Sequence, residues 1–293
     1  MLETIKNDHL EIAVESRGAE LQSLRSVKDN TQFLWQAGPG FWQRRSPVLF
    51  PIVGKLENDQ YSYQGKTYTM GQHGFARDKE FFLLHKGPDY LVYQLSHDTG
   101  TLKHYPFQFS LEIAYQLADN RLKVGYRVSN QQEKVMWFSV GGHPAFRCPL
   151  FDGESYADYC LELERKETAG RHLLDQGLLT DPPEPFLDNE NIIEMTPGMF
   201  DRDAIIFKGL KSNWISLKHK QKDYRLTLDF TGFPCLGIWA GTGSPFVCLE
   251  PWFGLAGNKG AEPDFTKKEG IMSLVVGGKF SCEFVVGIRI PNG

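Results

Sequence analysis

The stretch Phe109-Ser-Leu-Glu-Ile-Ala-Tyr-Gln-Leu117 is followed by Ala118-Asp-Asn120 and then by Leu122-Lys-Val-Gly-Tyr-Arg-Val128. Apolar and polar residues alternate through both arms, and this period of two is typical of β-strands with one buried face. Asp119 and Asn120 are residue types that favour a tight turn. The stretch therefore predicts a long β-hairpin.

The same alternation recurs along the chain, with turn residues between the runs. We expect residues 9–14 to pair with 21–27 across Arg17-Gly18, and residues 61–69 to form a tight hairpin around Gln64-Gly65. Convincing amphipathic helices are scarce, and the 29 glycines and 16 prolines fall mainly between the strand candidates. The sequence predicts an all-β protein, a sandwich or a barrel, with very little helix. Further strands are expected over 224–230, 236–239, 246–249 and 280–290.

Residues 181–201 form the most irregular stretch of the chain. They contain Pro182, Pro183, Pro185 and Pro197, and prolines interrupt the hydrogen-bonding ladder of a sheet. We therefore expect a long surface loop here. Strands resume after it with the same rhythm, so a single domain spanning residues 1–293 is predicted.

Composition and charge argue against several classes of function. The chain has 293 residues, a formal net charge of −4 and no run of five or more basic residues, so nucleic-acid binding through a basic face is not expected. No segment approaches 18 uninterrupted apolar residues, and residues 1–9 lack a signal-peptide-like stretch, so we expect no membrane association. The five cysteines are scattered and form no Cys-x-x-Cys pair, which disfavours a disulfide framework or a structural zinc site. A cytoplasmic protein that binds a small molecule, as a monomer or a homodimer, is the expectation.

Three short segments each place one titratable side chain among glycines, prolines and aromatic residues at the end of a strand-like run. The titratable groups are His73, His143 and Glu250, and two imidazoles with one carboxylate suffice for proton transfer to and from a neutral substrate near pH 7. Aromatic neighbours are what a sugar ring stacks on. The three segments are His73-Gly-Phe-Ala-Arg77, Gly141-Gly-His-Pro-Ala-Phe146 and Phe246-Val-Cys-Leu-Glu-Pro-Trp252. Together they predict acid–base chemistry on a carbohydrate.

Glu250 follows an apolar strand and precedes Pro251, and a residue before proline favours extended backbone. Period two places Phe246, Cys248 and Glu250 on one face of that strand. A carboxylate on an apolar, aromatic-rich face has a raised pKa, which suits a general base near neutrality. The plainer interpretation is a strand-end carboxylate paired with an arginine.

Other chemistries have less support. For His73 and His143 the plainer interpretation is a structural or solvated imidazole. A zinc site of His73, His143 and Glu250 is a further alternative, since zinc accepts two histidines and one carboxylate. Nothing in their spacing demands a metal, so we expect no metal and no cofactor. The chain also lacks a Gly-x-Gly-x-x-Gly segment after a strand, a Walker loop and a Gly-x-Ser-x-Gly elbow.

Further segments join these three in a characteristic order: Arg44-Arg-Ser-Pro-Val-Leu-Phe-Pro-Ile-Val-Gly-Lys55, Asp203-Ala-Ile-Ile-Phe207 and Ile238-Trp239. The ordered set resembles the aldose 1-epimerase (mutarotase) family, in particular the branch typified by the lactose-operon protein LacX. The resemblance covers roughly residues 3–290. It implies a large antiparallel β-sandwich of the galactose mutarotase type, with a sugar-binding cleft on one sheet.

The resemblance also implies an activity, the interconversion of the α and β anomers of a hexose or hexose derivative, free or phosphorylated, through the open-chain aldehyde. In the family's mechanism, the position matching Glu250 takes the proton from the C1 hydroxyl and the position matching His143 delivers a proton to the ring oxygen. These roles need a deprotonated Glu250 and a protonated His143. His73 matches a second family histidine that holds and polarises the sugar.

The resemblance and the motifs together give a set of expected substrate contacts. Asp203 matches the acidic residue that binds ring hydroxyls, and Arg44 or Arg45 stands near the substrate-binding arginine. Phe75, Arg77 and Trp239 lie within the motifs and complete the set. The alternative functions are a non-catalytic sugar-binding or sensing protein on the same fold and a glycoside hydrolase or lyase on a similar sandwich. A hydrolase would need a second carboxylate beside Glu250.

Overall fold

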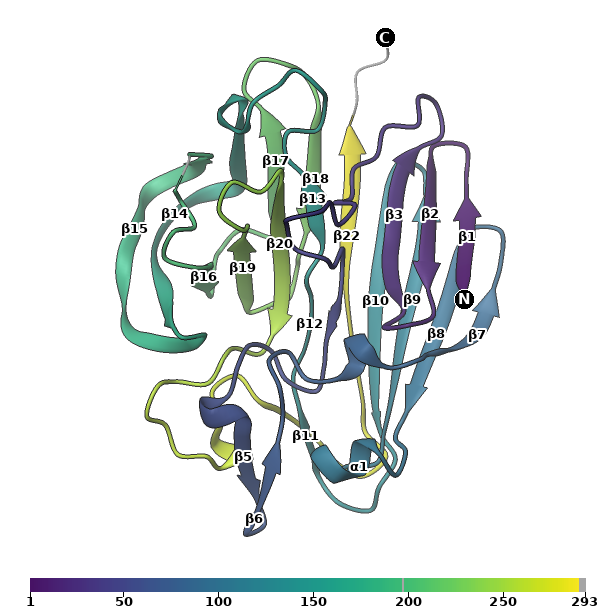
Figure 1. Ribbon diagram of the computed structural model, residues 1–293, viewed down its shortest axis with the longest axis vertical. Coiled ribbons are helices and arrows are strands. Elements are labelled where there is room, and N and C mark those ends of the chain that lie inside the picture. The colour runs from purple at the N-terminus through teal and green to yellow at the C-terminus, as the bar shows by residue number, and fades with distance from the viewer. Residues whose placement is uncertain (197, 290–293) are drawn as a thin grey trace.

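The computed structural model describes residues 1–196 and 198–289, which are almost entirely antiparallel β-structure (Figure 1). Fifteen strands form one sheet, in the order β4-β12-β20-β19-β16-β14-β17-β18-β22-β10-β9-β8-β7, with β13 paired to β20 and β15 paired to β14. Three smaller sheets accompany it, made of β1-β2-β3, β5-β6 and β11-β21. The expected all-β antiparallel fold with very little helix is confirmed.

The first half of the chain contains the strands β1 (Leu2–Lys6), β2 (Leu10–Glu15), β3 (Glu20–Ser26), β4 (Val48–Leu49), β5 (Gln60–Tyr63), β6 (Lys66–Thr69), β7 (Phe82–Lys86), β8 (Tyr90–Ser96), β9 (Phe109–Ala118), β10 (Arg121–Asn130), β11 (Met136–Phe138), β12 (Val140–Gly142) and β13 (Ala145–Arg147). The second half contains β14 (Tyr159–Asp175), β15 (Leu178–Glu194), β16 (Ile205–Lys208), β17 (Trp214–His219), β18 (Arg225–Asp229), β19 (Cys235–Trp239), β20 (Phe246–Phe253), β21 (Met272–Leu274) and β22 (Lys279–Arg289). The helical turns are α1 (Thr101–His104) and the 3₁₀ turns η1 (Glu57–Asp59), η2 (Ala76–Asp78), η3 (Tyr156–Asp158) and η4 (Phe265–Lys267). No helix among the described residues is long and apolar enough to cross a membrane.

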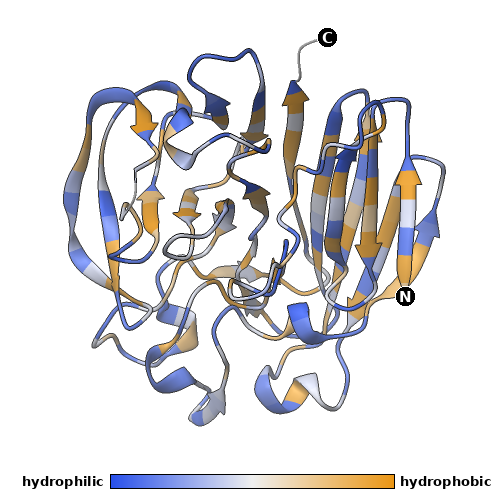
Figure 2. Ribbon diagram, turned by 45° about the horizontal axis from the view of Figure 1, so that its top comes forward, coloured by the Kyte–Doolittle hydropathy of each residue, from blue (hydrophilic) through white to orange (hydrophobic). Residues whose placement is uncertain are grey.

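The hairpin predicted from residues 109–128 is confirmed. Strands β9 and β10 pair antiparallel with Leu117 opposite Leu122, and Asp119 occupies the turn with a φ of 51°. The apolar residues of both strands are buried, as the period of two requires. Figure 2 shows this alternation of hydrophobic and hydrophilic residues along the long strands.

The buried side of this region is covered by the sheet β1-β2-β3, which lies over β8, β9 and β10 (Figure 1). The Tyr115 hydroxyl donates to the Ala19 carbonyl at 2.7 Å, and the Tyr93 hydroxyl donates to the Val14 carbonyl at 3.4 Å. These bonds satisfy two buried phenols between the layers. The arrangement is a sandwich with one layer much larger than the other.

The remaining short-range predictions hold with shifts of one or two residues, except that β20 continues four residues beyond its predicted end. Strands β2 and β3 pair across the Arg17-Gly18 turn, and β5 and β6 form the expected tight hairpin. Strands β18, β19, β20 and β22 lie where the sequence placed them, with β20 extended through Glu250 to Phe253. Ile290, the last residue of the predicted final strand, lies outside the described residues.

The prediction of a long surface loop over residues 181–201 is wrong. Strand β15 covers Leu178–Glu194 and pairs with β14 through several register shifts. Within the described part of the chain, β15 pairs in the sheet with β14 alone, so its other edge has no partner strand. A proline nitrogen on that edge, which has no hydrogen to donate, breaks no hydrogen bond of the sheet. Prolines therefore fit an edge strand, whereas they would break a central one. Pro197 lies outside the described residues.

The aromatic core holds the segments that carry the titratable motifs. The buried Phe50 ring packs against Phe75, Tyr105, Phe109 and Phe138. The Phe50 backbone accepts hydrogen bonds from the Phe75 and Ala76 amides, and its own amide donates to the His73 carbonyl at 3.2 Å. Core packing thus fixes the backbone at one of the three motifs.

We expect Phe50→Ala to lower the free energy of unfolding by about 3–5 kcal/mol, because it deletes a fully buried aromatic ring and leaves a cavity. Phe82→Ala is the matched control, since Phe82 is 72% exposed on the edge strand β7, and it should change stability by less than about 0.5 kcal/mol. Urea denaturation of the two variants measures both values. Equal losses in the two variants would contradict the assignment of Phe50 to the core.

Candidate active site

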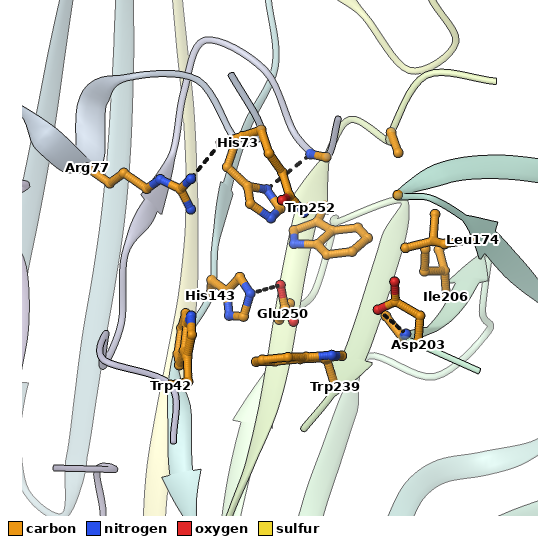
Figure 3. A pocket seen from close by; sticks show the side chains of 15 residues that line it. Trp42, His73, Arg77, His143, Leu174, Asp203, Ile206, Trp239, Glu250 and Trp252 are labelled. Carbon is orange, nitrogen blue, oxygen red and sulfur yellow. Dashed lines mark hydrogen bonds and ion pairs between the residues drawn. The ribbon is translucent and has the colours of Figure 1, made fainter. Parts of the chain in front are cut away.

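A cavity of about 350 Å³ brings the three motifs together (Figure 3). Its walls come from the break between β12 and β13, from β19 and β20, from β16 and the segment leading into it, from the tip of the β14–β15 hairpin and from loops. Such a volume and mixture of aromatic and polar groups suit a small polar ligand. The lining residues are Trp42, Gly54, Gln72, His73, Arg77, His143, Leu174, Gly177, Asp203, Ala204, Ile206, Trp239, Glu250, Trp252 and Ala256.

Glu250 lies in the middle of β20, where its neighbours Cys248 and Trp252 share its face of the strand. Its side chain is almost completely buried, with the residue 1% exposed. The Oε2 atom lies 3.3 Å from Nε2 of His143. The carboxylate is therefore paired with an imidazole and not with an arginine, the partner in the plainer interpretation of the sequence.

His143 lies at the short break between β12 and β13. Its amide donates to the Pro47 carbonyl at 3.1 Å, and its ring is stacked on the Trp42 indole with the centroids 4.6 Å apart. The Nδ1 atom has no hydrogen-bond partner among the described residues, so ring stacking takes the place of the usual orienting bond. A Cβ at the preceding Gly142 would lie 2.9 Å from the Tyr126 hydroxyl, so glycine is needed for this close packing.

His73 is held in one tautomer by the backbone. Its Nδ1 accepts a hydrogen bond from the Gly54 amide at 3.1 Å, so the proton of the neutral ring is on Nε2. The His73 amide in turn donates to the Gly54 carbonyl at 2.8 Å. Gly54 has a φ of 71°, and a Cβ at this position would clash with the backbone of Ala256, so a side chain does not fit there. His73 thus presents a fixed Nε2–H donor to the cavity (Figure 3).

Burial favours the neutral forms of the central pair. Burial lowers the pKa of His143 to about 3, and the positive charges of Arg77 and Arg44 act in the same direction. Burial also raises the pKa of Glu250 well above its ordinary value, and the Asp203 carboxylate adds to the rise. Both shifts favour a protonated Glu250 beside a neutral His143. The carboxylate and imidazolium that the family resemblance implies are the charged forms of the same pair, with the proton on the imidazole.

The two ends of the cavity have opposite charge. Figure 3 shows Arg77 and His73 on the His143 side and Asp203 on the Glu250 side. The Arg77 guanidinium donates to the Gln72 carbonyl at 2.7 Å. Asp203 has a φ of 70°, and its Oδ1 accepts a hydrogen bond from the Ala204 amide at 2.8 Å. A bound molecule would therefore meet donors at one end and an acceptor at the other.

The structure brings some of the expected substrate contacts to the cavity and not others. Arg77, Asp203 and Trp239 line it, as do all three titratable motif residues. Trp239 meets the His143 ring edge-on with the centroids 5.9 Å apart. These residues come from five separate segments of the chain.

Arg44, Arg45 and Phe75 are not among the lining residues. The Arg44 guanidinium donates to Asp78 at 2.8 Å, and the Arg45 guanidinium donates to the Gln36 carbonyl at 3.3 Å. Phe75 packs in the aromatic core against Phe50. The Arg44 guanidinium also donates to the Arg77 carbonyl at 3.5 Å, and the arginine that lines the cavity is Arg77.

Several lining residues were not expected from the sequence. Trp42 comes from a loop and is placed by its own carbonyl, which accepts from Trp35 Nε1 at 2.8 Å. Leu174 and Gly177 come from the tip of the β14–β15 hairpin. No pattern in the sequence indicated this hairpin, because residues 181–201, which contain most of its second strand, were predicted to be a loop. Trp252 stands two residues after Glu250 in β20. Side chains two residues apart share a face of a strand, so this spacing could have placed Trp252 beside Glu250.

Comparison with known proteins gives a consistent result. The family model described as aldose 1-epimerase matches residues 1–275. The plasmid-encoded protein LacX of Lactococcus lactis subsp. lactis is 35% identical over 262 residues, covering 86% of this chain and 87% of that protein.

Two solved structures share the fold over almost the whole chain. One is a galactose mutarotase related enzyme from Lactobacillus acidophilus, with a TM-score of 0.94 and 34% identity over 99% of this chain and 98% of the other. The second is a galactose mutarotase-like protein from Lactobacillus casei, with a TM-score of 0.90 and 33% identity over 99% of this chain and 100% of the other. The match over 275 residues, the cavity and its titratable pair agree, and the chain belongs to the aldose 1-epimerase family.

Proposed function

We propose that this protein is an aldose 1-epimerase that interconverts the α and β anomers of a hexose or hexose derivative. The observation that carries the proposal is the buried contact between His143 and Glu250, 3.3 Å apart in a cavity with tryptophan walls. A base and an acid that face one small cavity can serve the two oxygens bonded to one anomeric carbon. Family membership supports the same chemistry.

Ring opening requires two proton transfers. As the sugar hydroxyls bind the pair, the proton of Glu250 passes across the 3.3 Å contact to His143, giving a carboxylate and an imidazolium. Glu250 then takes the proton of the C1 hydroxyl while His143 gives its proton to the ring oxygen. The C1–O5 bond breaks as the C1=O1 double bond forms, so the product is the open-chain aldehyde.

Ring closure reverses these steps on the other carbonyl face. After rotation about the C1–C2 bond, the O5 hydroxyl attacks C1 and returns its proton to His143. Glu250 gives its proton back to the carbonyl oxygen, and the pair regains its starting state. An acid and a base placed in this way typically contribute about 10²–10⁴-fold each to the rate.

The charges at the two ends of the cavity orient the sugar. If O1 faces Glu250 and the ring oxygen faces His143, the C2 side of the ring points toward Asp203 and the C5 side toward Arg77. The Asp203 carboxylate then accepts hydrogen bonds from ring hydroxyls, while Arg77 and the Nε2–H of His73 donate to oxygens near C5. Trp42 and Trp239 provide the aromatic walls for the ring.

The first test is the reaction itself. Freshly dissolved α-anomers of common aldoses and aldose phosphates should reach anomeric equilibrium faster with the purified protein, as followed by polarimetry. Two-dimensional exchange NMR at C1 checks the same step at equilibrium. Binding of a sugar without faster exchange would favour a sugar sensor, and no effect on any aldose tested would overturn the proposal.

We expect Glu250→Gln to reduce kcat by about 10²–10⁴-fold, because an amide cannot take the proton of the C1 hydroxyl. Sugar binding, measured by calorimetry, should remain within a few-fold of the wild type, since the amide keeps the shape of the side chain. Glu283→Gln, an exposed change on β22, is the matched control and should leave kcat unaltered. A fully active Glu250→Gln variant would remove Glu250 from its proposed role.

Stacking on Trp42 should hold the His143 ring in its working orientation. We expect Trp42→Ala to lower kcat by about two- to tenfold, the equivalent of the 0.5–1.5 kcal/mol of an aromatic pair. Trp42→Phe should restore most of the loss because it keeps a flat ring there. Trp214→Ala, on the distant strand β17, is the control. An unchanged kcat in Trp42→Ala would show that His143 needs no such support.

A further inference from the structure

Three buried side chains with metal-binding atoms lie close together, His143, Cys248 and Glu250, and two of them, His143 and Glu250, line the cavity. One nitrogen, one sulfur and one oxygen from these residues all lie within 4.8 Å of one another. The residues are 7%, 0% and 1% exposed, respectively. Cys248 stands two residues before Glu250 on β20, so both side chains leave the same face of the strand.

The spacing of the three atoms is close to that of ligands around a tetrahedral ion. Zinc binds histidine nitrogen and carboxylate oxygen at about 2.0–2.1 Å, so two such ligands on one tetrahedral ion lie about 3.3–3.4 Å apart. Nε2 of His143 and Oε2 of Glu250 are 3.3 Å apart. With a Zn–S bond of about 2.3 Å the sulfur would lie about 3.6 Å from the other two ligand atoms, so from the 4.8 Å limit it would need to approach by roughly 1.2 Å at most.

The atoms that would bind the ion have few other partners. Apart from the 3.3 Å contact with Nε2 of His143, Glu250 Oε2 has no hydrogen-bond partner among the described residues. His143 and Glu250 line the cavity, so an ion reaches the site by the route a sugar would use. His73 is not part of this set. Its Nδ1 accepts the Gly54 amide, so its Nε2 carries the ring proton and offers no lone pair to a metal.

We propose that His143, Cys248 and Glu250 form an inhibitory zinc site, in which Zn²⁺ binds between the acid and the base and excludes the sugar. The thiol and the carboxyl release their protons to solvent as the Zn–S and Zn–O bonds form. The two negative ligands then neutralise the ion, so the filled site buries no net charge. The fourth position faces the cavity and takes water. A set of nitrogen, sulfur and oxygen ligands selects Zn²⁺ over Mg²⁺ and Ca²⁺, which prefer oxygen ligands alone.

The inhibition rests on the proposed function, because zinc would occupy the two groups that move protons. No step of the proposed reaction uses the metal. The binding of the ion itself is independent of the reaction, so the two claims are tested separately.

Binding is tested with Co²⁺, which occupies zinc sites and reports a thiolate ligand through a charge-transfer absorption band. The wild-type protein, freed of metal, should bind one Co²⁺ with this band, and Zn²⁺ should displace it. Cys248→Ala should lose the band, whereas Cys282→Ala, which removes the most exposed of the five cysteines, should keep it. Glu250→Gln and His143→Asn should keep a thiolate band but bind about 100-fold more weakly or worse.

Inhibition is tested by adding Zn²⁺ during anomer exchange. Activity should fall and return with EDTA, and in Cys248→Ala the zinc concentration for half inhibition, relative to the variant's own metal-free rate, should rise about 100-fold or more. Absence of the cobalt band in the wild type, or its loss in Cys282→Ala, would overturn the zinc site. An active enzyme that shows the band yet keeps full activity with zinc bound would overturn the inhibitory role. A protein that binds cobalt through Cys248 and exchanges no aldose would retain the site and contradict the proposed function.

Discussion

His143 and Glu250 meet at 3.3 Å inside the protein, where both side chains are almost completely buried. Two ionisable groups are taken out of water and left with one proton between them, because a buried charge without a partner costs several kcal/mol. Such a pair is unfavourable in a site that has only to be stable. It becomes useful where a ligand supplies two oxygens, one that loses a proton and one that gains it.

The fold brings this pair together from distant parts of the chain. The long strand β20 supplies Glu250, and the break between β12 and β13 supplies His143. The sheet register sets the distance between the backbones, while Trp42 stacks on the imidazole from outside the sheet. The aromatic core around Phe50 fixes the backbone beside His73, so the third group is tied to the same frame.

Much of this could be predicted from the sequence, and the failures have physical causes. The alternation of apolar and polar residues predicted the β9–β10 hairpin almost to the residue, because each strand has one buried face and the turn between them is made of favourable residues. The prolines of β15 were misread because a sequence does not reveal which strand lies at a sheet edge. The motifs identified Glu250, His143 and His73 as cavity residues, yet Arg44 and Arg45 were assigned by proximity in sequence and their partners lie elsewhere. Trp42 lies in a loop, where no periodic pattern indicates the direction of a side chain.

A crystal structure of the Glu250→Gln variant with an aldose bound tests most directly whether His143 and Glu250 are the groups that move the protons. We expect one sugar ring in the cavity, its C1 oxygen within hydrogen-bonding distance of the side chain at position 250 and its ring oxygen within reach of His143 Nε2. A sugar seated with its anomeric carbon toward Arg77, or bound outside this cavity, would contradict it.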